Sequence, residues 1–261
     1  MLGIVYKYQG RVRDAVQAYG RARIFLRRCA PRNDIAFAVL YHNLGGVEFA
    51  RERYALAERL ARRGLAIRRR YHGRCHPDVA ADLTALAAVL YGRKKYSAAL
   101  NMLELADDMF RKTRSSQAVR ELAVIDNTRG ATLQALGRFA QAERCYRRSL
   151  ARRRRVLGEK HPDVGLALNN LADLYYRLGR NAEAQATSRR AVSVLMAALG
   201  PRHPHTRTAI ANARRMVDEA IPAARIRRNR KNQLERNRHR SHRRPPASRG
   251  RDEETARTAS R

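Results

Sequence analysis

The sequence predicts an all-α protein, a solenoid of antiparallel helix pairs followed by a disordered basic tail. Three observations lead to this prediction. A hexapeptide ending in alanine recurs five times, at steps of 42, 42, 43 and 42 residues. Apolar residues between its copies follow the three- and four-residue steps of a helix, and no segment alternates as a β-strand would.

The hexapeptides mark the turn and the start of the second helix in each pair. They are GRVRDA from Gly10, ERYALA from Glu52, KKYSAA from Lys94, GRFAQA from Gly137 and GRNAEA from Gly179. Seven residues before each copy lies a small residue, where two helix backbones approach closely: Gly3, Gly45, Ala87, Gly130 and Ala172. The third hexapeptide residue is expected to pack beside these small positions as a plug. It is Val12, Tyr54, Tyr96, Phe139 or Asn181.

The helix after the fourth hexapeptide has an apolar stripe and an arginine-rich side. Its stripe consists of Ala142, Cys145, Tyr146, Ser149, Leu150 and Val156. The arginines fall largely on the opposite side, which predicts a solvated outer face: Arg144, Arg147, Arg148 and Arg152 to Arg155. Linkers such as GRCHPDVA and GEKHPDVG lead into the next pair, and their Asp78 and Asp163 suit a helix N-cap or first turn.

The positions of Leu171, Ala172, Tyr175, Gly179, Ala184 and Ala191 resemble the tetratricopeptide repeat. The 42-residue period, the HPDV linkers and the NNLA segment Asn169 to Ala172 are similar to its kinesin-light-chain-type variety. The resemblance covers residues 1–220 and implies a right-handed superhelix whose first helices line a concave groove. Three features depart from it: Arg129 replaces a leucine, Asn181 replaces the aromatic plug, and the linker TRSSQAVREL lacks HPDV.

The two ends differ from the repeats. The first helix is only the stub LGIVYKY, which predicts that an N-terminal capping element is missing and that the chain is truncated. The segment HPHTRTAIANARRMVDEA is expected to form a solvating end helix, which Pro222 terminates. Residues 221–261 carry 14 basic and 4 acidic side chains and no Phe, Tyr or Trp, so we expect a disordered tail.

Composition bounds the partners and the location. The net charge of +33 favours acidic or polyanionic partners, although 50 arginines against 6 lysines equally fit codon usage in a GC-rich genome. The sequence has no run of about 18 apolar residues that could span a membrane, and its opening MLGIVYKYQGR reaches a charge too soon for the hydrophobic core of a signal peptide. A cytoplasmic location is therefore expected. The widely spaced Cys29, Cys75 and Cys145 are interpreted as free thiols.

Signatures of catalysis and of metal binding are weak or missing. The sequence has no GxxxxGK[ST], GxGxxG, HExxH or GxSxG motif. His72, Cys75 and His76 come closest to a metal site, but His76 recurs in later linkers as His161 and His203, where no cysteine accompanies it. A structural role is therefore favoured, and no metal, cofactor or enzyme activity is predicted.

The leading hypothesis is a scaffold that binds an acidic peptide segment in its groove. By the repeat register, the groove is expected to include His42, Asn43, Gly46, Phe49, Thr84, Ala88, Tyr91, Asn127, Gln134, Asn169, Asn170, Asp173, Tyr176 and Arg177. The resemblance implies that Asn43, Asn127, Asn169 and Asn170 clamp a peptide backbone; the alternative is that each lies on a polar helix face.

A second hypothesis is a nucleic-acid-associated protein, in which arginine-rich surfaces and the tail bind phosphates without reading sequence. Its candidate contacts are Arg147, Arg148, Arg227, Arg228, Arg230 and Lys231. Neither the partner nor the oligomeric state is predicted.

Overall fold

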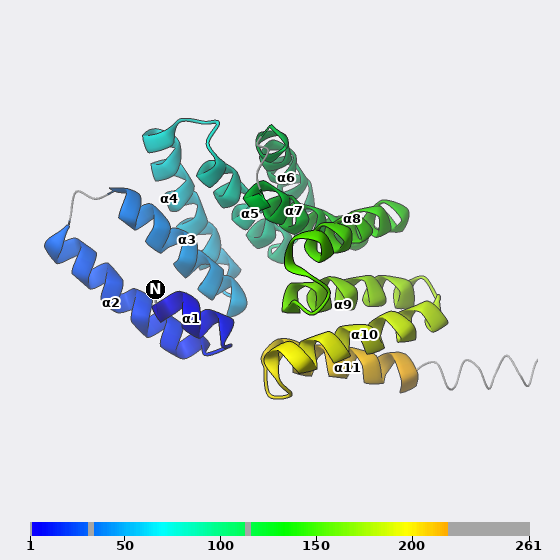
Figure 1. Ribbon diagram of the computed structural model, residues 1–261. Helices are drawn as coiled ribbons and strands as arrows, with labels where there is room; N and C mark the ends of the chain where they lie inside the picture. The colour runs from blue at the N-terminus through cyan, green and yellow to red at the C-terminus, as the bar shows by residue number, and fades with distance from the viewer. Residues whose placement is uncertain (1, 31–33, 113–115, 219–261) are drawn as a thin grey trace, which may run out of the picture. The chain divides into compact units, whose positions relative to one another are not determined.

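The computed structural model describes residues 2–30, 34–112 and 116–218, and within these ranges all regular structure is helical (Figure 1). The helices are α1 (Leu2–Tyr8), α2 (Val12–Cys29), α3 (Asp34–Ala50), α4 (Tyr54–His72), α5 (Pro77–Gly92), α6 (Tyr96–Arg111), α7 (Ser116–Ala135), α8 (Phe139–Leu157), α9 (Pro162–Arg177), α10 (Asn181–Leu199) and α11 (Pro204–Asp218). Each odd-numbered helix up to α9 packs on the even-numbered helix after it, and each pair then contacts the next. The predicted all-α solenoid is confirmed.

Each hexapeptide lies at the tight turn inside a pair, and the second helix begins at its third residue. The first residue of every copy has a left-handed backbone: φ is 72° at Gly10, 74° at Gly137 and 71° at Gly179, but 59° at Glu52 and at Lys94. The turn closes with backbone bonds such as that from the Arg138 N–H to the Leu133 carbonyl, at 2.9 Å. Glycine is the residue that adopts this conformation without strain.

A stability prediction arises from this turn. Replacing Lys94 by glycine is expected to raise the free energy of unfolding by about 0.5–1 kcal/mol, because the left-handed strain is relieved and only part of the gain is offset by greater freedom in the unfolded chain. Denaturant titration of Lys94→Gly and of Lys94→Ala measures the effect. The alanine variant is expected to show no gain, and a lower midpoint for the glycine variant would contradict the explanation.

The small positions do hold close helix contacts, but the ring beside them is not the predicted plug. A Cβ atom added at Gly3 would lie 2.6 Å from the Tyr19 ring, and one at Gly130 would lie 2.8 Å from the Tyr146 ring. The predicted plug Tyr54 instead faces Gly92 of the following pair and packs edge-on against Phe49. The plug prediction was therefore wrong at Gly3, Gly45 and Gly130, because the aromatic ring at the start of α4 packs against the end of α3 and against Gly92 of the next pair instead.

The histidines that recur in the linkers have a local structural role. His76 and His161 are the N-caps of α5 and α9: their Nδ1 atoms accept the backbone N–H of Asp78 at 3.2 Å and of Asp163 at 3.1 Å. The two aspartates lie in the first turn, where a carboxylate interacts well with the helix dipole. The sequence predicted either an N-cap or a first-turn position for Asp78 and Asp163, and the structure places both in the first turn.

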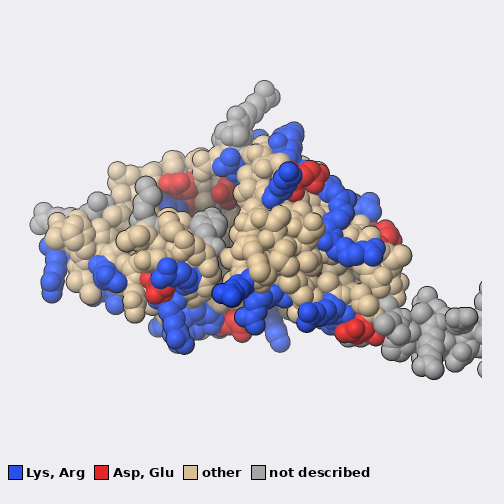
Figure 2. Space-filling model, turned by 60° about the horizontal axis from the view of Figure 1, so that its bottom comes forward, with Lys and Arg blue, Asp and Glu red and all other residues tan. Residues whose placement is uncertain are grey.

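Several arginine side chains pair with carboxylates of neighbouring helices. Figure 2 shows acidic side chains scattered among the basic ones on the face it presents. Arg148 and Arg152 both pair with the buried Asp126. Arg129, the predicted departure, bonds Asp107 at 3.1 Å and the Leu103 carbonyl at 3.3 Å. At this position, where the other repeats carry leucine, an arginine thus forms an ion pair with a neighbouring helix.

The array ends with α11, which packs through its buried residues Thr206, Ala209 and Met216 as the predicted end helix. The predicted basic tail, residues 221–261, lies outside the described residues. None of the helices in the described ranges has the length and apolar character needed to span a bilayer.

Candidate functional site

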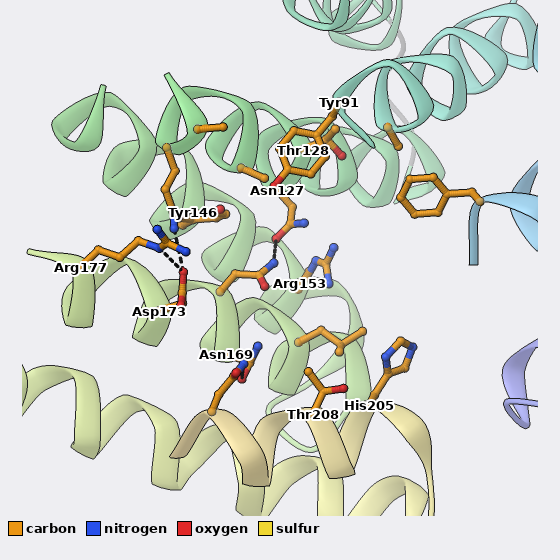
Figure 3. Close-up of a pocket in the computed structure, with 18 of the residues that line it drawn as sticks. Tyr91, Asn127, Thr128, Tyr146, Arg153, Asn169, Asp173, Arg177, His205 and Thr208 are labelled. Atoms are coloured by element: carbon orange, nitrogen blue, oxygen red, sulfur yellow. Dashed lines mark hydrogen bonds and ion pairs between the residues drawn. The ribbon is translucent and has the colours of Figure 1, made fainter. Parts of the chain in front are cut away.

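A cavity of about 760 Å³ runs along the first helices of successive pairs, and we call it the groove pocket. Its walls come chiefly from α5, α7, α9 and α11 (Figure 3). The structure brings these predicted groove residues together in its lining: Phe49, Ala88, Tyr91, Asn127, Gln134, Asn169, Asn170, Asp173 and Arg177. The other lining residues are Tyr96, Thr128, Ala131, Ala135, Tyr146, Arg153, Leu166, His205, Thr208 and Asn212.

Side-chain amides form bridges between neighbouring repeats in the groove pocket. Asn170 Nδ2 donates to Asn127 Oδ1 at 2.9 Å, and Asn212 Nδ2 donates to Asn169 Oδ1 at 3.2 Å. Each bridge uses one donor and one acceptor and leaves the Asn127 and Asn169 amino groups without another partner among the described residues. An amide that both donates and accepts matches a peptide group.

The wall near Asp173 is a closed polar network. Asp173 Oδ2 accepts from Gln134 Nε2 and from Arg177 Nε, both at 2.8 Å, and Oδ1 accepts from Arg215 at 2.9 Å. The Tyr146 hydroxyl donates to Gln134 Oε1 at 3.1 Å. Burial raises the pKa of both Tyr146 and Tyr91, so their phenols stay neutral. Asp173 therefore accepts three hydrogen bonds from residues of α7, α9 and α11.

The remaining predicted groove residues do not line this cavity. His42 Nδ1 lies 2.6 Å from Asp82 Oδ1, and Asn43 donates to the Val39 carbonyl of its own helix at 2.9 Å. Tyr176 packs beside the core and has the Arg215 guanidinium over its ring, 5.4 Å from the centroid. Thr84 is buried and donates to the Ala80 carbonyl. Gly46 is also absent from the lining.

Sequence reasoning missed Arg153, which it assigned to the solvated outer face. Arg153 is only 8% exposed and lines both the groove pocket and a second cavity of about 510 Å³. We call the second cavity the histidine pocket, because His161, His203 and His205 line it together with Arg120, Glu121 and Arg152. The outer-face prediction was wrong here because one helical turn holds both outward and inward arginines. The register of Arg153 with the buried Leu195 is the signal that could have revealed it.

The candidate polyanion contacts are only partly described. Arg147 and Arg148 have exposed side chains, but Arg147 pairs with Glu143 at 2.8 Å and Arg148 with Asp126 at 3.0 Å. Arg227, Arg228, Arg230 and Lys231 lie outside the described residues.

A cluster of possible metal ligands lies at the linker before α5. One ligand atom each from His72, His76 and Asp78 falls within 4.8 Å of the others, and the two imidazole rings are stacked. His76 Nδ1, however, already accepts the Asp78 backbone N–H. Neutral His76 therefore carries its proton on Nε2, and to ligate a metal it would have to give up its N-cap bond.

Comparisons with known proteins agree with the repeat seen in the sequence. The family model described as "Tetratricopeptide repeat" matches residues 36–112 and 121–197, more than half of the chain. Protein KINESIN LIGHT CHAIN-RELATED 2 from Arabidopsis thaliana is 27% identical over 177 residues, which are 67% of this chain and 26% of that protein. The chain therefore spans about a quarter of the length of the curated relatives it matches.

Solved structures share the fold at low sequence identity. BtubC (BKLC) from P. vanneervenii superposes with a TM-score of 0.62 and 19% identity, covering 94% of this chain and 97% of that one. A Rap protein complexed with Competence and Sporulation Factor superposes with a TM-score of 0.66 and 17% identity, covering 90% of this chain and 68% of that one.

Proposed function

Because this chain belongs to the tetratricopeptide-repeat family, with repeats of the kinesin-light-chain type, we propose that it is a non-catalytic protein-interaction scaffold. Its ligand is an extended, acidic segment of a partner protein, bound in the groove pocket. Helical repeat arrays present concave surfaces of this kind to their partners. The solved Rap protein that shares the fold is itself complexed with Competence and Sporulation Factor.

The observation that carries the proposal is the row of amide bridges along the groove pocket. Asn127, Asn169 and Asn170 keep donors and acceptors that can pair with successive peptide groups. Tyr91 and Tyr96 add aromatic surface to the same cavity, and aromatic side chains contribute much of the energy of interfaces. The net charge of +33 favours acidic over basic ligands.

A peptide selection tests this function. We expect a random peptide library displayed against the full chain to yield acidic binders. Changing Asn169 and Asn170 together to alanine is expected to weaken the binding free energy of a selected peptide by about 1–3 kcal/mol, because backbone groups of the peptide are left unpaired. Fluorescence anisotropy measures the dissociation constant, and thermal unfolding checks that the variant stays folded.

A matched arginine pair separates this function from polyanion binding. Arg144 and Arg155 lie exposed on α8 and have no ion-pair partner among the described residues, so removing them breaks no ion pair there. We expect Arg144→Ala with Arg155→Ala to leave peptide affinity within about twofold, whereas Arg148→Ala would also disturb Asp126. If this pair abolished peptide binding while the asparagine pair had no effect, the groove proposal would be overturned and the basic surface favoured.

A further inference from the structure

Arg153 is a buried cation that forms no ion pair in the described part of the chain, although the Asp163 carboxylate attracts it electrostatically. Its Nη1 donates to the Asp163 backbone carbonyl at 2.7 Å, and no other described residue accepts a hydrogen bond from it or forms an ion pair with it. Burial lowers the pKa of its guanidinium, which reflects how unfavourable the charge is in this place. A buried guanidinium with only one hydrogen-bond acceptor and no ion pair is destabilising. Both cavities nevertheless open onto this side chain.

The same chain contains a completed version of this site. Arg68 precedes Arg153 by 85 residues and makes the equivalent bond, from Nη1 to the Asp78 backbone carbonyl at 3.2 Å. Arg68 also bonds Asp82 Oδ1 at 2.9 Å, and the same oxygen lies 2.6 Å from His42. A single carboxylate thus joins Arg68 to His42.

In the later repeat the carboxylate is missing from the protein, but the groups that would hold it remain. The residue 85 positions after Asp82 is Ala167, which is fully buried. The residue 85 positions after His42 is Asn127, whose amino group has no partner among the described residues and lines the groove pocket. In Figure 3, Arg153 and Asn127 both lie in the wall of this cavity.

In most of the other repeats, the positions equivalent to Arg153 and Ala167 hold apolar residues. The residues at the Arg153 position elsewhere are Leu26, Phe110 and Leu195, and those at the Ala167 position are Leu40, Ile125 and Ala209. Both positions are apolar in three repeats, and in one repeat they hold opposite charges. Only the repeat of Arg153 and Ala167 combines a charge with an apolar partner.

We propose that Arg153 and Asn127 bind a carboxylate of the ligand, which takes the place that Asp82 fills against Arg68 and His42. This inference rests on the proposed function in that the carboxylate is supplied by the acidic segment in the groove pocket. The carboxylates already lining the cavities do not supply it. Asp173 already accepts three hydrogen bonds from other residues, and neither Asp163 nor Glu121 forms an ion pair with Arg153, although Asp163 attracts it electrostatically. Burial also raises the pKa of Glu121, which disfavours its charged form.

The test uses small probes on the full chain. N-acetyl-aspartate N′-methylamide presents the carboxylate, the matching asparagine compound is its neutral control, and inorganic phosphate is the competing anion, all at constant ionic strength in chloride. We expect the aspartate compound to raise the thermal unfolding temperature of the wild type more than either control. An equal effect of the neutral compound, or a larger effect of phosphate, would overturn the carboxylate assignment.

Two variants locate the site. Arg153→Leu introduces the residue found at positions 26 and 195. It is expected to raise the unfolding temperature measured without any probe, and to lower the affinity for the aspartate compound at least tenfold. Ala167→Asp rebuilds the internal counter-ion and is expected to give the same two results. An unchanged probe response in Arg153→Leu would refute the proposal, even if Ala167→Asp failed to fold.

The outcome is separable from that of the proposed function. If the selected peptides depend on Asn169 and Asn170 but not on Arg153, the groove function stands and the carboxylate site is wrong. If the aspartate compound binds through Arg153 while no peptide is enriched, the carboxylate site stands without the peptide function.

Discussion

Gly130→Leu is expected to lower the free energy of unfolding by about 3 kcal/mol or more. A Cβ atom at this position would already lie 2.8 Å from two carbons of the Tyr146 ring. That ring cannot move aside easily, because it is 3% exposed and its hydroxyl is bonded to Gln134. Leucine would add three further carbons at a contact between α7 and α8 that is already too close for a Cβ atom.

Urea titration monitored by circular dichroism measures this loss. Gly20, within α2, is the matched control, because an added Cβ there meets nothing within 4 Å. Gly20→Ala is expected to be neutral or to gain up to about 1 kcal/mol through its higher helix propensity. If Gly130→Leu unfolded at the wild-type midpoint, the close contact between α7 and α8 would have to be abandoned.

Asp82→Ala is expected to destabilise the protein by about 3–5 kcal/mol, because it leaves the buried Arg68 without a counter-ion. Arg68 is 7% exposed and Asp82 is 2% exposed, so water cannot replace the lost carboxylate. His42, which contacts the same carboxylate oxygen, loses its partner as well. The change reproduces the pairing of a buried arginine with alanine that the chain holds at Arg153 and Ala167.

A double substitution is the control for this prediction. Arg68→Leu with Asp82→Leu copies the pair Leu26 and Leu40 of the first repeat. We expect its free energy of unfolding to return to within about 1 kcal/mol of the wild type, since Arg68 Nε and Asp82 Oδ2 are buried without hydrogen-bond partners among the described residues. Thermal and urea unfolding of the single and double variants decide the matter. A double variant as unstable as Asp82→Ala would show that the loss comes from packing.

Local features of the chain were the best predicted. The period and the helix–turn–helix order of each unit were predicted, because they depend on short-range preferences. The structure added that the second helix begins at the third residue of each hexapeptide, after a residue with a left-handed backbone. The linker histidines were seen as a repeated element, but their role as N-caps was not. An N-cap bond depends on the side-chain torsion angles of the histidine, which the sequence does not specify.

The contents of the groove were predicted in part. Register alone indicated Asn127, Asn169 and Asp173, since residues one period apart lie on equivalent faces of successive first helices. Arg153 was missed, because its own helix is crowded with arginines and helical periodicity sorted it with its outward neighbours. The plug failed for a similar reason: Tyr54 reaches Gly92 in the next pair, and the side chain's reach decided the contact.

The sequence by itself determined the repeat, its helix pairs and the order of their faces, since these depend on residues close together in the chain. Only the tertiary structure decided which charges meet. Asp82 joins Arg68 to His42 across three helices, while Ala167 leaves Arg153 facing two cavities. Such pairings depend on how far each side chain extends across a helix contact, and the difference of one carboxylate leaves Arg153 without the ion pair that Arg68 forms.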